Sequence, residues 1–232
     1  MGTTLPGREQ YLARWSATHG GVDTTSPGFV RGWLSVVYLA ARPVARLGVS
    51  PSVVTVLGVL VAAAVVPLAL AGGRWPLLVA MVVLLSGLLD GVDGAVAVMN
   101  ARSSAWGAVL DAVADRCSDL AYVVGLLALA GWGPAWVRWL AAACGALTLM
   151  HEYLRSRAAL AGVSDVGVVT VAERPTRVVV TLMCCLAAGV YPSAADRWGQ
   201  VALAAWAVTG VVGLVQLGVV VRRRLRGSVT SG

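Results

Sequence analysis

Long apolar runs separated by short polar stretches make up most of this chain. A run of about twenty residues crosses a hydrocarbon core of ~30 Å at 1.5 Å per residue, so each run is a candidate membrane span. Six such spans are predicted, at about 52–71, 75–99, 103–130, 135–157, 176–195 and 199–221. The pattern therefore predicts an all-α integral membrane protein.

The segment before the first span has a different pattern. Across residues 29–47, apolar positions alternate with arginines at helical spacing, which predicts an amphipathic helix lying in the membrane interface. We expect residues 1–28 to form a polar cytoplasmic lead-in and residues 222–232 a basic cytoplasmic tail. The domain organisation is then one membrane-embedded domain, 29–221, with a polar extension at each end.

The composition excludes a soluble globular class. The chain has 232 residues, of which 58% are hydrophobic and only 12% are charged, and its mean hydropathy is +0.80. The net charge of +7 comes from 18 arginines without a lysine. These arginines lie between apolar runs, not on one soluble face, so they indicate contact with membrane lipids and no nucleic-acid partner.

The distribution of arginines predicts the orientation. With the N-terminus inside, the inner ends carry 14 arginines and the outer loops three, with Arg116 left inside a span. Several tryptophans, among them Trp75 and Trp198, then fall at the outer ends, as in an aromatic belt. This predicts a multi-pass protein of the cell membrane with both termini in the cytoplasm.

Five of the eleven acidic residues fall within thirty positions of apolar sequence: Asp90, Asp93, Asp111, Asp115 and Asp119. An ionised Asp at mid-bilayer costs roughly 2.5–3.5 kcal/mol, so the cluster requires compensation, for which a bound divalent cation is best suited. Helical spacing places the first two on one face and the next two on another. A turn near residues 100–104 would make the two helices antiparallel neighbours. Oxygen ligands of this kind favour Mg²⁺ or Mn²⁺ over zinc.

Neighbouring residues refine this prediction. Gly94 and Gly107, and less completely Ala97, leave room for a nucleotide or a close backbone approach. Asp115 is the natural candidate for a general base toward an incoming hydroxyl. We interpret Asp119 as a structural partner of Arg116, and His151 with Glu152 as a polar pair at a helix end.

The spacing resembles a known signature. Asp90-x2-Asp93-Gly94-x2-Ala97 followed by Gly107-x3-Asp111-x3-Asp115 is similar to the motif of the CDP-alcohol phosphotransferase family. The resemblance implies that an alcohol attacks the β-phosphate of a CDP-linked lipid, here CDP-diacylglycerol (CDP-DAG), and releases CMP with two divalent ions. It implies that Asp90, Asp93, Asp111 and Asp115 ligate metal, with Asp115 also the base. It further implies a CDP-lipid site lined by Thr55, Gly94, Ala97, Ser104 and Gly107.

A second resemblance concerns the acceptor. Tyr153-x-Arg155-x-Arg157 and Glu173-Arg174-Pro175-x-Arg177 are similar to the acceptor segment of the phosphatidylinositol-phosphate synthase branch. It implies that Arg155, Arg157, Arg174 and Arg177 bind the phosphate of inositol phosphate or, as a second choice, of glycerol 3-phosphate. As positive-inside anchors, these arginines would need no acceptor.

Other functions stay open at this point. The chain could use phosphatidylglycerol as acceptor, as a cardiolipin-type synthase does, or it could be a divalent-cation carrier or a lipid-binding protein without turnover. Its spans are rich in Ala and Gly, which permits a homodimer without requiring one. One departure bears on this choice: the family signature has Arg after the Ala, where this chain has Val98. Our hypothesis is that Arg102, one turn further on, reaches the donor phosphates instead.

Overall fold

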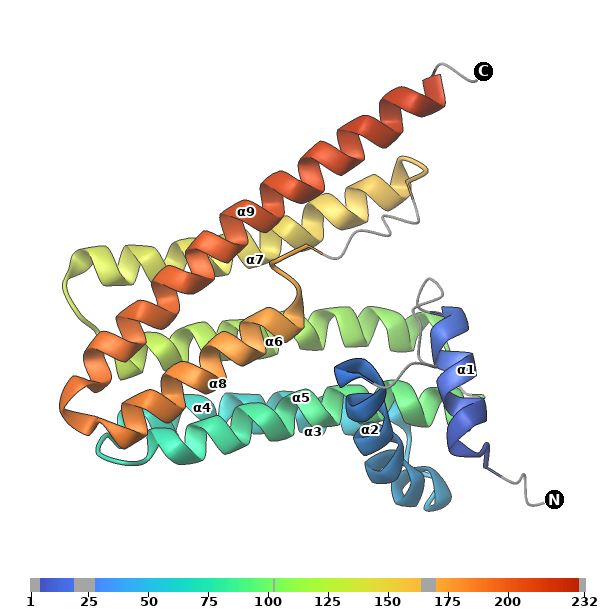
Figure 1. Cartoon of the computed structure of the whole chain (residues 1–232), viewed down its shortest axis with the longest axis horizontal. Coiled ribbons are helices and arrows are strands. Elements are labelled where there is room, and N and C mark those ends of the chain that lie inside the picture. Colours follow the sequence, from blue (N-terminus) through green and yellow to red (C-terminus); the bar gives the residue numbers. More distant parts are fainter. Residues whose placement is uncertain (1–4, 19–27, 102, 164–169, 230–232) are drawn as a thin grey trace. The chain divides into compact units, whose positions relative to one another are not determined.

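A computed structural model describes residues 5–18, 28–101, 103–163 and 170–229, and across these ranges the regular structure is helical. This confirms the predicted all-α class. The helices, with one short 3-10 turn (η1), are α1 Arg8–Thr18, α2 Phe29–Arg46, α3 Pro51–Ala63, α4 Val65–Leu70, α5 Pro76–Met99, α6 Ala105–Leu129, α7 Ala135–Leu160, α8 Arg174–Val190, η1 Pro192–Ala194 and α9 Ala195–Val229 (Figure 1).

Three stretches within the described residues are long and apolar enough to cross a membrane. They are Pro51–Leu70, Pro76–Met99 and Pro192–Arg226. The first differs from its prediction because it is two helices, α3 and α4, that meet at Ala64. Pro67 explains the break, since a proline has no N–H to donate and its ring crowds the carbonyl four residues earlier, at Ala63.

The last helix is longer than a bilayer requires. α9 has 35 residues, about 50 Å at 1.5 Å per residue, against a hydrocarbon core of ~30 Å. The basic segment from Arg222 to Arg226 belongs to this helix, although the sequence pattern predicts a separate tail after residue 221. α8 begins at Arg174, and Pro175 lies in its first turn, where proline favours helix initiation.

The helices form two compact units, each with its own core. The first unit comprises Met1–Val61 with Leu85–Asp115, and the second comprises Ala62–Leu84 with Arg116–Gly232. In the first unit, α1, α2, α3 and the second half of α5 bury an apolar cluster. It contains Tyr11, Leu12, Leu34, Val37, Tyr38, Ala41, Ala45, Val54, Val92, Ala95, Val96 and Met99.

The second unit packs α9 against α7 and α8, which lie beside it in Figure 1. Its core also takes side chains from α4, the first half of α5 and α6, with Trp206 of α9 as its largest fully buried residue. Small residues bring the backbones close together. A Cβ added at Gly199 would lie 2.6 Å from the backbone N of Ala130 and 2.9 Å from the carbonyl oxygen of Leu126, so the α9 backbone lies directly on the end of α6.

This contact predicts an asymmetry between two glycines of α9. Gly199→Ala places a methyl group against backbone atoms that cannot rotate away, and we expect a loss of about 1–3 kcal/mol. Gly218 has open space around its Cα, so an added methyl group meets no neighbour there. Because alanine loses less conformational entropy than glycine when the helix forms, we expect Gly218→Ala to stabilise the protein by up to ~1 kcal/mol. Thermal unfolding in detergent should show a lower Tm for the first variant and an equal or higher Tm for the second. An unchanged Tm for Gly199→Ala would contradict the close packing.

Candidate active site

Three carboxylates converge in the first unit. Asp90 of α5 and Asp111 and Asp115 of α6 each offer an oxygen, and these oxygens all lie within 4.8 Å of one another. Asp111 and Asp115 are one helical turn apart and share a face. After α5, Ala101 has a φ of 49°, a left-handed conformation that helps to turn the chain back toward α6.

The arrangement fits a divalent cation. Three carboxylates this close repel one another when ionised, and the repulsion is relieved by a positive charge among them. Oxygen donors are the ligands that Mg²⁺ and Mn²⁺ prefer. Of the four aspartates predicted to bind metal, the structure therefore brings three together, two from adjacent turns of α6 and one from α5.

The fourth aspartate makes different contacts. Asp93 is 5% exposed; its Oδ2 accepts a hydrogen bond from the Thr55 hydroxyl at 2.5 Å, and its Oδ1 accepts one from the Gly94 N–H at 2.6 Å. The Thr55 oxygen also lies 3.1 Å from the Pro51 carbonyl oxygen. Thr55 thus connects the start of α3 to the aspartate-bearing segment of α5.

A cavity of about 300 Å³ opens beside these groups in the first unit. Among the residues predicted to bind the CDP-lipid, the lining contains Thr55, Gly94, Ala97, Ser104 and Gly107. It also contains two of the aspartates, Asp93 and Asp111. The remaining lining residues are Ser50, Pro51, Ser52, Ser103 and Ala108. The cavity is therefore rich in hydroxyl groups and small side chains, as a polar head with several acceptor atoms requires.

Five lining residues were not among those predicted for the site: Ser50, Pro51, Ser52, Ser103 and Ala108. A signal for the first three existed, because the Ser50-Pro51-Ser52 turn precedes Thr55 by less than two helical turns. The signal for Ser103 and Ala108 was their adjacency to Ser104 and Gly107. Arg102, predicted to hold the donor phosphates, lies outside the described residues.

Local capping explains two of the lining residues. Ser104 precedes α6, and its Oγ accepts a hydrogen bond from the Gly107 N–H at 3.0 Å, the usual N-cap geometry. A Cβ at Gly107 would lie 3.1 Å from the same oxygen. The 25-residue helix α6 thus begins at the cavity, and its N-terminal dipole favours anionic groups there.

Val98 does not line the cavity. It packs instead against the apolar cluster of the first unit. An apolar residue suits this position, since its side chain contributes to the core that carries α5.

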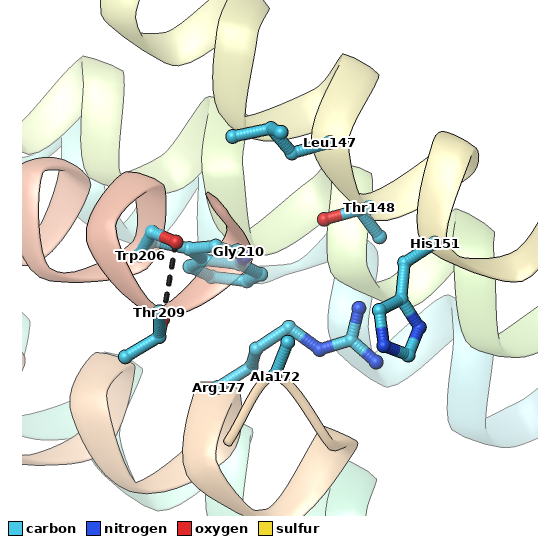
Figure 2. A pocket seen from close by; sticks show the side chains of 8 residues that line it. All are labelled: Leu147, Thr148, His151, Ala172, Arg177, Trp206, Thr209 and Gly210. Carbon is cyan, nitrogen blue, oxygen red and sulfur yellow. Dashed lines mark hydrogen bonds between the residues drawn. The ribbon is translucent and has the colours of Figure 1, made fainter. Parts of the chain in front are cut away.

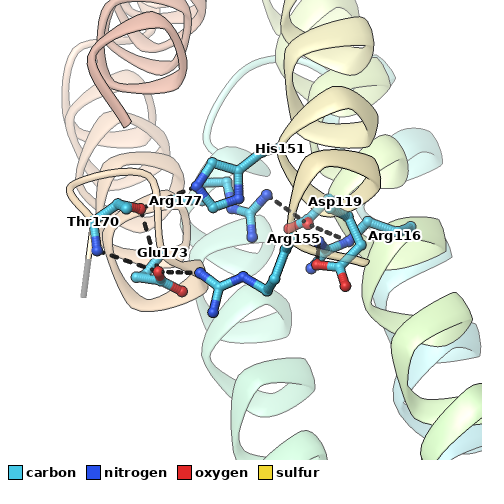
Figure 3. Close-up of polar contacts among 8 residues, drawn as sticks. Arg116, Asp119, His151, Arg155, Thr170, Glu173 and Arg177 are labelled. Carbon is cyan, nitrogen blue, oxygen red and sulfur yellow. Dashed lines mark hydrogen bonds and ion pairs between the residues drawn. The ribbon is translucent and has the colours of Figure 1, made fainter. Parts of the chain in front are cut away.

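The four arginines predicted to bind the acceptor lie in the second unit, and Figure 3 shows two of them, Arg155 and Arg177. Arg155 forms an ion pair with Glu173 at 2.6 Å. Glu173 Oε1 also accepts hydrogen bonds from the N–H and the hydroxyl of Thr170. Arg177 forms an ion pair with Asp119 at 3.0 Å, and its side chain is only 6% exposed. Arg157 lies exposed on α7, and Arg174 is partly buried at the start of α8.

The interpretation of Asp119 as a partner of Arg116 is confirmed, with Arg116 Nε 3.4 Å from Asp119 Oδ2. The interpretation of His151 and Glu152 as a pair at a helix end is wrong. Glu152 instead accepts from Arg116 at 3.0 Å, while His151 Nε2 lies 3.1 Å from Thr170 Oγ1. α7 continues past both residues to Leu160, because the apolar positions of its final turns still pack into the second unit.

A much smaller cavity, of about 10 Å³, lies in the second unit (Figure 2). Its polar lining comes from Thr148, His151, Arg177 and Thr209, and its apolar lining from Leu147, Ala172, Trp206 and Gly210. A volume of this size holds about one water molecule. Of these two cavities among the described residues, the larger one, in the first unit, has room for a substrate.

Comparison with known proteins identifies the family. The family model for CDP-alcohol phosphatidyltransferase matches residues 48–215, so this chain belongs to the CDP-alcohol phosphatidyltransferase family. It is 32% identical to the phosphatidylinositol phosphate synthase of Cutibacterium acnes over 204 residues, which cover 84% of this chain and 96% of that protein. It is 31% identical to the archaetidylinositol phosphate synthase of Pyrococcus horikoshii over 169 residues, 68% of this chain and 82% of the relative.

Two solved structures of the phosphatidylinositol phosphate synthase of Mycobacterium tuberculosis share the fold. One, in complex with manganese and citrate, matches with a TM-score of 0.66 and 30% identity, over 80% of this chain and 88% of that one. The other, with CDP-DAG bound, matches with a TM-score of 0.62 and 29% identity, over 78% and 92% of the two chains. The expected family and the expected divalent-cation dependence are therefore confirmed.

The contact between Thr55 and Asp93 predicts the effect of two substitutions. Thr55→Val keeps the shape but leaves a buried carboxylate with one fewer donor, and we expect CMP release to fall by about 10–100-fold, the usual effect of losing a group that orients a ligand. Thr55→Ser keeps the hydroxyl and should retain most of the activity. The rate of CMP release from CDP-DAG measures both. Equal rates for the Val and Ser variants would exclude a role for this hydrogen bond.

Proposed function

We propose that this protein transfers a phosphatidyl group from CDP-DAG to a hydroxyl of inositol phosphate, releasing CMP in phospholipid biosynthesis. The convergence of Asp90, Asp111 and Asp115 next to the 300 Å³ cavity carries the proposal. The similarity to phosphatidylinositol phosphate synthases over most of both chains supports the same donor and acceptor.

In this proposal the four aspartates of the motif bind metal, and one of them is also the base. Asp90, Asp111 and Asp115, with Asp93 beside Thr55, would hold two divalent ions, which when bound neutralise the phosphates of the donor. Asp115 would take the proton from the attacking hydroxyl. The acceptor oxygen then forms a bond to the β-phosphorus, the bond between that phosphorus and the bridging oxygen breaks, and CMP leaves with that oxygen.

The donor would occupy the cavity of the first unit. Thr55, Gly94, Ala97, Ser104 and Gly107 would line the nucleotide and pyrophosphate, and Arg102 would contact the phosphates. The start of α6 supports this placement, since its free N–H groups attract anionic oxygens. The absence of side-chain bulk at Gly94 and Gly107 leaves the backbone open to the donor.

The four arginines predicted to bind the acceptor's phosphate differ in how far their side chains are buried. Arg157 is exposed, and the Arg155–Glu173 pair is partly exposed, with 36% and 28% of its side chains accessible. We propose that Arg155, Arg157 and Arg174 contact the phosphate, since guanidinium groups bind phosphate oxygens in pairs. Arg177 is enclosed and neutralises Asp119, so its proposed role is to hold α8 against α6.

The faces of α2 support the proposed interfacial helix. One face, with Leu34, Val37 and Ala41, is buried in the first unit. Val36 and Leu39 belong to the opposite face and are exposed, and the stripe continues past the helix at Leu47, which is 81% exposed. A helix that is apolar on both its protein face and its outer face, with exposed arginines along one side, is suited to lie at the lipid surface. Six spans with both termini and the site on the cytoplasmic side complete the proposed topology.

An acceptor panel tests the reaction. Protein in lipid nanodiscs with Mn²⁺ and CDP-DAG should release CMP with inositol phosphate at least tenfold faster than with free inositol, glycerol 3-phosphate or phosphatidylglycerol. Asp115→Asn should reduce the rate by at least 10³-fold, because it removes both a ligand and the base. Preference for phosphatidylglycerol would indicate a cardiolipin-type synthase. Release with none of the acceptors would favour a carrier or a lipid-binding protein.

The arginines predict a change in acceptor affinity. Arg157→Ala should raise the KM for inositol phosphate about tenfold with little change in kcat, because an exposed guanidinium contributes binding in the ground state and the transition state alike. Arg223→Ala, an exposed arginine near the end of α9, serves as the matched control and should leave KM unchanged. Equal KM values for both variants would assign Arg157 to membrane anchoring.

A further inference from the structure

Gly91 lies inside the aspartate motif, directly after Asp90 and two positions before Asp93. An ideal Cβ built on Gly91 would lie 2.8 Å from Val37 Cγ2 and 3.4 Å from Val37 Cγ1. Real Cβ atoms essentially never approach another heavy atom to 2.8 Å. Helix α2 therefore packs on α5 at the one residue between the two aspartates that has no side chain.

Val37 has little freedom to make room. It is 1% exposed, and its β-branched side chain has few rotamers in a helix. α2 also contacts α1 and the residues just before it. The Tyr38 hydroxyl donates to the Pro6 carbonyl oxygen at 3.2 Å, and the rings of Tyr38 and Tyr11 lie 5.6 Å apart. An ion pair of 2.9 Å joins Arg31 of α2 to Glu9 of α1.

α5 is also held on its opposite face. Positions 89 and 93 lie about half a turn from position 91, so they point away from α2. There the Ser86 hydroxyl donates to the Gly58 carbonyl oxygen at 3.1 Å, and Thr55 donates to Asp93. The aspartate-bearing part of α5 is thus packed between α2 and α3, and a displacement at Gly91 has to move one of these contacts.

We infer that Gly91 is a positioning residue: by letting α5 pack closely on Val37 of α2, it determines where α5 places its aspartates. The inference rests on the proposed function in that the aspartates bind metal. Ligand distances in metal sites lie within about 0.2 Å of their usual values. A shift of α5 by a few tenths of an ångström would separate Asp90 from the two aspartates of α6.

The test is a double substitution read out by Mn²⁺ binding. Purified protein in nanodiscs is titrated with Mn²⁺ without substrate, and free Mn²⁺ is followed by electron paramagnetic resonance. Gly91→Ala should weaken binding about tenfold, by analogy with the loss of groups that orient metal ligands. Adding Val37→Ala removes the two methyl groups that the new Cβ meets, and binding should return to within about threefold of the wild type.

Gly58→Ala is the matched control, because its Cβ would lie 3.6 Å from Leu89 Cβ, an ordinary contact; its Mn²⁺ affinity should not change. Tm without metal is measured for every variant. A role in stability alone would lower the Tm of Gly91→Ala and leave its Mn²⁺ affinity intact, which would overturn the inference. Should Gly91→Ala fail to fold, the double variant must fold and bind Mn²⁺; its failure also overturns the inference. Wild-type protein that binds no Mn²⁺ would instead contradict the proposed function.

Discussion

The repulsion among carboxylates brought together in an apolar protein is the constraint on which this structure depends. Asp90, Asp111 and Asp115 place oxygens within 4.8 Å of one another, in a chain that is 58% hydrophobic. Ionised aspartates this close repel one another, and divalent ions with a preference for oxygen relieve that repulsion. Three other features serve the same site. The hydrogen bond from Thr55 holds Asp93, while the small residues and the capped start of α6 leave room for the donor beside the aspartates.

In the second unit, two arginines compensate a buried aspartate. Asp119 is fully buried, and Arg116 and Arg177 provide its positive partners. Breaking a buried pair by removing one partner costs about 3–5 kcal/mol, because the other charge stays behind. This explains how one protein places acidic residues on successive turns of α6 for two purposes. Arg157 is exposed, and in our proposal it binds the acceptor's phosphate instead of neutralising a buried carboxylate.

Much of this could be predicted from the sequence because the signals are local. The spacing of the aspartates fixed their helix faces, and the length and polarity of the apolar runs fixed the helical class. One local signal was outweighed: Pro67 marks the break between α3 and α4, but the length of the apolar run favoured one uninterrupted span. Two features required the folded chain. The contact between Gly91 and Val37 joins positions far apart in sequence. The pairing of Glu152 with Arg116 links two helices, and periodicity along one helix carries no signal for a partner on another.

The central claim is tested most directly by locating manganese in crystals grown with Mn²⁺, from its anomalous scattering. The account predicts metal peaks about 2.1 Å from carboxylate oxygens of Asp90, Asp111 and Asp115, and loss of those peaks in crystals of Asp111→Asn. Manganese bound elsewhere, with these three side chains turned away from one another, would contradict it.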